Sequence, residues 1–134
     1  SRGLGDVYKR QEISRFMLAV KTQSAKMQRI STYVFDEIDA GLSGRAAQKV
    51  AMKLKEVSRG RQVICVTHSA QIAAQADCHM RISKSVSDGK TYTKVERLDT
   101  EGRKYEIARI TGGLDVTELQ LKSAEEMLKN AGNL

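Results

Sequence analysis

The chain has 134 residues, 40% hydrophobic and 29% charged, which fits one globular domain with a real core. No apolar run approaches the ~20 residues of a membrane-spanning helix and no secretory signal opens the chain, so we expect a cytoplasmic protein with no membrane partner. The 23 basic and 16 acidic residues give a net charge of +7, which suits a polyanion such as DNA. Because no aromatic residues are interleaved with the basic ones near the N-terminus, a solvated helix face is an equal alternative.

The sequence pattern changes after residue 11. Residues 1–11 show no apolar period, and we interpret them as an irregular or disordered lead-in. From Ile13 onward, apolar side chains recur at helical spacing. This spacing predicts an amphipathic helix over residues 12–29.

Two apolar strands joined by a helix are predicted next. The strands cover residues 31–35 and 62–66, and their continuous apolar character is typical of a parallel sheet covered on both faces. The intervening helix ends near Gly60, and the hydroxyl of Ser43 is expected to cap its start. A strand–helix–strand crossover predicts a parallel, right-handed pair.

A β-hairpin is predicted over residues 80–98. Apolar residues alternate with polar ones up to Val86, a second β-rich run follows, and Asp88-Gly89 supplies a two-residue turn between them. We expect this hairpin to extend the edge of the parallel sheet, with its lysines and arginines discouraging further pairing.

Three helices complete the predicted α/β fold. One short, alanine-rich helix covers residues 69–77 before the hairpin. Another follows the hairpin over residues 101–110 and stops at Gly112. Thr117 and Gln120 form a capping box that opens the last helix.

The chemistry is expected at the carboxyl end of the first strand, where Asp36 and Glu37 follow the apolar run. Because parallel strands end at one edge of a sheet, His68, which follows the second strand, should lie near them. Adjacent carboxylates suit phosphate chemistry: we assign Asp36 to Mg²⁺ and Glu37 to polarising a water that attacks a terminal phosphate. The simpler alternative is that the acids only begin a loop.

A phosphate-binding loop of the form Gly-x-x-x-x-Gly-Lys-[Ser/Thr] does not occur in the sequence. The acids then have no nucleotide to act on unless another segment holds one. We therefore expect the second half of a nucleotide-hydrolysing domain, and we expect the isolated chain to be inactive and to bind ATP weakly.

Both cysteines are expected to be buried or half-buried without a disulfide, because Cys65 lies in an apolar strand and Cys78 precedes another. A zinc site that includes His68 and His79 is disfavoured, since Cys78 and His79 are adjacent and lack the usual spacer.

Three motifs carry a resemblance to a known family: Asp-Glu-Ile-Asp-Ala-Gly-Leu-Ser-Gly-Arg at 36–45, Val-Ile-Cys-Val-Thr-His at 63–68 and Gln-Ile-Ala at 71–73. Together they closely resemble the C-terminal ATPase segment of the RecN family, bacterial DNA double-strand-break repair proteins related to the SMC and ABC ATPases. The likeness covers about residues 12–128. It implies that residues 12–134 form the C-terminal part of an ABC/SMC-type P-loop ATPase head.

The resemblance also implies roles for four residues. Asp36 matches the Walker B aspartate that binds Mg²⁺, Glu37 the catalytic glutamate, Asp39 the D-loop aspartate and His68 the switch histidine that senses the terminal phosphate of ATP. The same resemblance implies a homodimer of two heads that sandwich ATP, with DNA as a further partner. It also implies a missing N-terminal half that carries the Walker A loop, a role in recombination and a nucleoid location in bacteria.

The segment Glu12-Ile13-Ser14-Arg15 resembles the tail of the family's signature motif, which makes Glu12 and Ser14 candidate contacts to the nucleotide of the opposite head. The family's preceding Ser-Gly-Gly is replaced by Lys9-Arg10-Gln11. These bulky cations do not offer the close backbone approach that glycine permits, which puts the signature function in doubt. From this mismatch with the family we interpret residues 1–11 as foreign or mis-joined sequence on a truncated gene fragment.

Other function classes remain open at this point. Asp36-Glu37-Ile38-Asp39 also satisfies the Asp-Glu-x-Asp box of helicases, although a helix that leads into the acid-bearing strand fits the ABC order better. A transporter ATPase is a further alternative. In a non-catalytic DNA- or partner-binding module, the acids would merely cap a strand.

Overall fold

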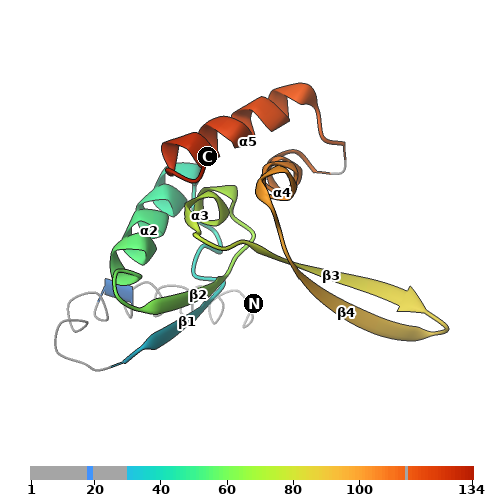
Figure 1. The fold of residues 1–134 in the computed structure, drawn as a ribbon, viewed down its shortest axis with the longest axis horizontal. Coiled ribbons are helices and arrows are strands. Elements are labelled where there is room, and N and C mark those ends of the chain that lie inside the picture. Colours follow the sequence, from blue (N-terminus) through green and yellow to red (C-terminus); the bar gives the residue numbers. More distant parts are fainter. Residues whose placement is uncertain (1–17, 20–29, 114) are drawn as a thin grey trace, which may run out of the picture. The chain divides into compact units, whose positions relative to one another are not determined.

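The computed structural model describes residues 18–19, 30–113 and 115–134 of the chain (Figure 1). The chain divides into two compact units, Ser1–Ile72 and Ala73–Leu134, which are described in turn. The elements are β1 (Thr32–Asp36), α2 (Gly44–Val57), β2 (Gln62–Val66), α3 (Ala70–Gln75), β3 (Met80–Ser87), β4 (Lys90–Arg97), α4 (Thr100–Gly112) and α5 (Glu118–Asn130). Parallel and antiparallel strands with flanking helices confirm the predicted α/β class.

The first unit is built on the parallel pair β1 and β2, which are aligned from Thr32 opposite Gln62 to Asp36 opposite Val66. The predicted crossover is confirmed, with α2 lying along one face of the pair (Figure 1). Tyr33 and Phe35 point into the core. There they join apolar side chains of α2, chiefly Ala51, Leu54 and Val57.

Among the described residues, apolar side chains cover one face of this sheet, whereas the sequence predicts cover on both faces. Val34 is 62% exposed, and Ile64 and Val66 are also exposed. The physical reason is that α2 and its neighbours supply one apolar layer, while no described element packs on the other face. Strands that read as continuously apolar therefore alternate between buried and exposed positions in β1, and between half-buried and exposed positions in β2.

The start of α2 also differs from expectation. Ser43 occupies the N-cap position with an extended backbone, but its hydroxyl makes no capping hydrogen bond, so the predicted side-chain cap is wrong. The carbonyl of Ser43 instead accepts the first helical bond, from Ala47 N at 2.9 Å. Helix α2 is therefore stabilised mainly by its buried apolar face rather than by its cap.

In the second unit, β3 and β4 form an antiparallel ribbon with Asp88 and Gly89 at the turn (Figure 1). Both turn residues have positive φ, 51° and 71°, as a two-residue hairpin turn requires. The predicted hairpin is confirmed. The expectation that it extends the parallel sheet is wrong, because β3 pairs with β4 and with no other described strand. Because the turn is tight, backbone N–H and C=O groups of the two strands form hydrogen bonds with each other and do not need a further strand.

Helices α4 and α5 form the core of the second unit. Ile107 and Ala108 of α4 and Ala124 and Leu128 of α5 are all buried. The guanidinium of Arg103, on the same helix as Ile107, is also buried and donates to the carbonyl of Ala76 at 2.7 Å. This bond fixes the chain segment that follows α3 onto α4.

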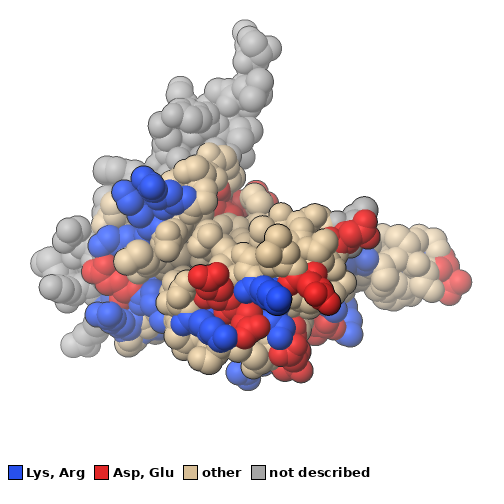
Figure 2. Space-filling model, turned by 90° about the horizontal axis from the view of Figure 1, so that it is seen from above, with Lys and Arg blue, Asp and Glu red and all other residues tan. Residues whose placement is uncertain are grey.

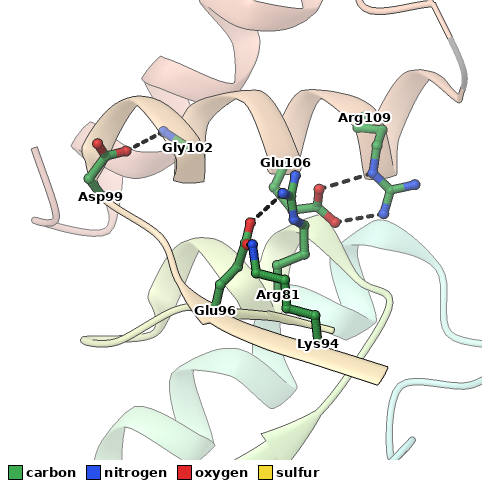
Figure 3. A network of polar contacts seen from close by, with 7 residues as sticks. All are labelled: Arg81, Lys94, Glu96, Asp99, Gly102, Glu106 and Arg109. Carbon is green, nitrogen blue, oxygen red and sulfur yellow. Dashed lines mark hydrogen bonds and ion pairs between the residues drawn. The ribbon is translucent and has the colours of Figure 1, made fainter. Parts of the chain in front are cut away.

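A polar network connects the ribbon with α4 (Figure 3). Glu96 on β4 pairs with Arg81 on β3 and with Lys94. Arg81 reaches towards Glu106 of α4, which pairs with Arg109 (Figure 3). Hydrogen bonds from Arg109 hold the pKa of Glu106 below its usual value, so this buried carboxylate stays charged in its network.

The structure describes only part of the predicted N-terminal elements. Leu18 and Ala19 are helical, as predicted, and Leu18 is buried in the core of the first unit. The remainder of the predicted helix at 12–29 and the proposed lead-in at 1–11 lie outside the described residues. Within the described part of the chain, none of the helices has the length and apolar character needed to cross a membrane.

We expect Thr117→Ala to lower the free energy of unfolding by about 1 kcal/mol. The predicted capping box is present: Thr117 N donates to Gln120 Oε1 at 2.8 Å, and Gln120 N donates to Thr117 Oγ1 at 3.3 Å. Urea titration checks the change, with Ser123→Ala on the exposed surface of α5 as the control. Equal midpoints for wild type and Thr117→Ala would contradict a stabilising role for the box.

Candidate active site

The chain reverses direction directly after β1, and this reversal exposes two acids in succession. Strand alternation continues through buried Phe35 and exposed Asp36, so Glu37 should point inward. Instead Glu37 is exposed, and Ile38 and Asp39 are buried, at 1% and 4% exposure. Both carboxylates predicted to perform the chemistry are therefore presented to solvent together.

The backbone of Glu37 explains the break in alternation. Its φ is 46°, in the left-handed region that non-glycine residues seldom adopt. Such a conformation costs on the order of 1–3 kcal/mol and persists only when the surroundings hold it. A strained glutamate next to an aspartate, at the end of a sheet strand, is typical of a functional site.

The ends of the two strands are adjacent, as the sequence predicts. Glu37 N donates to the carbonyl of Val66 at 2.9 Å, which extends the parallel pairing one residue beyond β1. His68 follows Val66 by two residues, and its side chain is 69% exposed. The structure thus brings Asp36, Glu37 and His68 to one edge of the sheet, while their chemical roles remain predictions.

Asp39 lies in a different environment from the two exposed acids. Its Oδ2 accepts a hydrogen bond from Thr67 Oγ1 at 2.6 Å and lies 4.0 Å from His68 Nδ1. Its Oδ1 is buried and has no hydrogen-bond partner among the described residues. Thr67 is not among the predicted site residues, although a hydroxyl residue directly before His68 at a strand end was the available signal.

The cysteines differ from each other more than expected. Cys65 is partly buried in β2, and burial, followed by the negative charges of Asp39 and Asp36, raises the pKa of its thiol to about 12. Cys78 is exposed, so the prediction that it is buried or half-buried is wrong. It lies in the loop between α3 and β3.

The exposed acids fit Mg²⁺ better than a metal that needs an all-protein cage. Within the described ranges no three His, Cys, Asp or Glu residues cluster closely enough to hold a metal. Mg²⁺ usually takes one or two carboxylates and fills its other positions with water and phosphate oxygens. Asp36, exposed beside Glu37, satisfies that need. The other predicted nucleotide contacts, Glu12 and Ser14, lie outside the described residues.

No family model matches the sequence. A solved SMC ATPase structure matches with a TM-score of 0.56 and 30% sequence identity, over 75% of this chain and 57% of that one. Together with the acids at the sheet edge, this match identifies the fold as part of an SMC-type ATPase head.

Curated DNA repair proteins named RecN are similar over most of the chain. The Bacillus subtilis protein is 45% identical over 120 residues, which are 90% of this chain and 21% of the relative. The Halalkalibacterium halodurans protein is 44% identical over 92% of this chain and 22% of its own length. The Haemophilus influenzae protein is 39% identical over 87% of this chain and 21% of its own length. The chain thus spans about a fifth of these relatives. The matches support a RecN C-terminal segment, as the motifs predict, and favour neither the helicase nor the binding-module alternative.

The strain at Glu37 can be tested with two truncations. Glycine adopts positive φ freely and alanine does not, so Glu37→Gly should unfold with a free energy about 1 kcal/mol higher than Glu37→Ala. The same pair at Glu126, an exposed helical position, should show the opposite order by about 1 kcal/mol. Urea unfolding measures both pairs. If the alanine variant were the more stable one at both positions, the left-handed backbone would not strain Glu37.

Alkylation should distinguish the two cysteines. Only thiolates react readily, so iodoacetamide at about pH 8 should modify exposed Cys78 and spare Cys65, whose pKa is raised to about 12. Peptide mass spectrometry measures the extent at each position. Unfolding in urea should make both cysteines react, which serves as the control. Equal labelling of both in native buffer would contradict the described packing of Cys65.

Proposed function

We propose that this chain supplies the Walker B, D-loop and switch-histidine elements of an ATPase head in a RecN-type DNA repair protein. The observation that carries the proposal is the pair Asp36 and Glu37, exposed together at the carboxyl edge of a parallel sheet with Glu37 held at positive φ. Open α/β sheets bind ligands at that edge. The SMC-type fold and the RecN similarity are consistent with nucleotide chemistry there.

In this proposal each exposed side chain has one task. Asp36 would hold Mg²⁺, which when bound neutralises charge on the phosphate oxygens of ATP. Glu37 accepts a proton from the water that attacks the terminal phosphate, a general-base role for which an exposed carboxylate is suited. His68, exposed at the same edge, is positioned to donate a hydrogen bond to that phosphate. Asp39 contributes to the same site from its buried position.

The proposal requires partners outside the printed sequence. The phosphate-binding loop would come from another part of the RecN-type protein, since this chain contains no such motif, and residues 12–134 would form the C-terminal half of the head. On this basis the isolated chain neither binds ATP tightly nor hydrolyses it. Residues 1–11 would be a lead-in without a part in the site.

A second head and DNA are the proposed macromolecular partners. The solved SMC ATPase is described as showing ATP-driven dimerisation and DNA-stimulated activation, and we extend both properties to this family member, acting in repair and recombination at the bacterial nucleoid. On the face seen in Figure 2, basic and acidic side chains are intermingled rather than separated. The proposed DNA contact therefore rests on the relatives rather than on a charged patch of the described residues in this view.

Glu37→Gln, in a full-length RecN-type protein that carries this segment, is the decisive test. Glutamine keeps the size of the side chain but cannot accept the proton, so kcat should fall by about 10²- to 10⁴-fold. ATP should still bind, and the unhydrolysed complex should accumulate as a head-to-head dimer. Phosphate release measures turnover, and size-exclusion chromatography with ATP measures dimerisation.

Asp36→Asn is the matched control for that experiment, because it changes the neighbouring carboxylate in the same way. It should weaken Mg²⁺-dependent ATP binding and therefore prevent dimer accumulation, unlike Glu37→Gln. Wild-type turnover in Glu37→Gln would show that Glu37 is not the base. Identical behaviour of the two variants would show that the proposed division of roles is wrong.

A further inference from the structure

Thr67 makes two hydrogen bonds whose directions are determined by their partners. The backbone N–H of Ser69 can only donate, and it lies 2.9 Å from Thr67 Oγ1. A carboxylate can only accept, so the hydroxyl proton of Thr67 points to Asp39 Oδ2, at 2.6 Å. The hydroxyl therefore accepts from Ser69 and donates to Asp39 at the same time.

These two hydrogen bonds restrain the backbone on both sides of His68. Thr67 and Ser69 are its chain neighbours, and the bond between them bridges the backbone of His68. The bond to Asp39 then ties this short loop to the turn after β1, 28 residues earlier in the sequence. The Asp39 side chain is only 1% exposed, so this attachment point is buried within the first unit.

Asp39 does not hold the imidazole directly. The 4.0 Å between Oδ2 and Nδ1 is too long for a hydrogen bond, and the His68 side chain is largely exposed. The position of the ring is therefore set by the loop backbone that carries it. Among the described contacts, the side-chain bonds that fix this backbone are those of Thr67.

We infer that Thr67 is a positioning residue, which holds His68 at the reacting edge by linking the loop after β2 to buried Asp39. The inference rests on the proposed function, because it assigns to His68 a role in phosphate sensing. It gives Asp39 a structural task through Oδ2 in addition to any contact with nucleotide. A displacement of about 1 Å in a catalytic group can cost up to about 100-fold in rate.

Two substitutions in the full-length RecN-type protein separate the hydroxyl from the rest of the side chain. Thr67→Val keeps the branched shape and removes both hydrogen bonds, so we expect kcat for ATP hydrolysis to fall about 10- to 100-fold with KM for ATP nearly unchanged. Thr67→Ser keeps the hydroxyl, and its kcat should remain within about threefold of wild type. A purely structural role would lower the thermal midpoint of Thr67→Val without changing kcat of the folded protein.

A double variant tests whether Thr67 acts through His68. His68→Ala should slow hydrolysis by itself, and adding Thr67→Val should then slow it little further, because the group being positioned is absent. If Thr67→Val lowers kcat by the same factor with and without His68, the inference is overturned. An unchanged kcat in Thr67→Val also overturns it.

Different results would refute the proposed function and the role of Thr67. If Glu37→Gln and His68→Ala both leave turnover at the wild-type rate, the proposed function itself is wrong and the inference fails with it. If both slow hydrolysis while Thr67→Val does not, the proposed function stands and only the role of Thr67 is refuted. Rescue of Thr67→Val kinetics by serine at that position supports the inference.

Discussion

The candidate site depends on the parallel pairing of β1 with β2. The register that places Asp36 opposite Val66 also places Glu37 N on the carbonyl of Val66, and it brings Asp39 within reach of Thr67. A shift of one residue in β1 would turn Tyr33 and Phe35 outward and Asp36 inward, because side chains alternate between faces. The buried face of the strand therefore holds the register, and the register holds the site.

Elements whose signals are local could be predicted from the sequence. Each strand of the parallel pair was located to within one residue, since a short apolar run bounded by polar residues has few other interpretations. The turn at Asp88 and Gly89 and the capping box of Thr117 and Gln120 depend on side chains at most three residues apart. The prediction that Asp36, Glu37 and His68 lie at one edge of the sheet used the same local signals, together with the rule that parallel strands end at the same edge.

Features that depend on distant neighbours could not be predicted. The partner of Asp39 is 28 residues away, so neither the burial of Asp39 nor its hydrogen bond with Thr67 follows from the adjacent sequence. Coverage of a sheet likewise depends on which other elements pack on it: β1 reads as covered on both faces, yet Val34 is exposed. Propensity disfavours a positive φ at a glutamate, so Glu37 is a position where the candidate site departs from a local rule.

Burial of Ile38, the apolar residue within Asp-Glu-Ile-Asp, explains how Glu37 can keep a positive φ. The left-handed backbone of Glu37 costs on the order of 1–3 kcal/mol, while full burial of an isoleucine side chain contributes about 1.5–3 kcal/mol. Ile38 is 1% exposed and follows Glu37 directly, so its burial is of the size needed to offset the strain. The hydrogen bond of Asp39 then fixes the turn on its far side. Two exposed acids can be held in a fixed arrangement because the next two residues are buried.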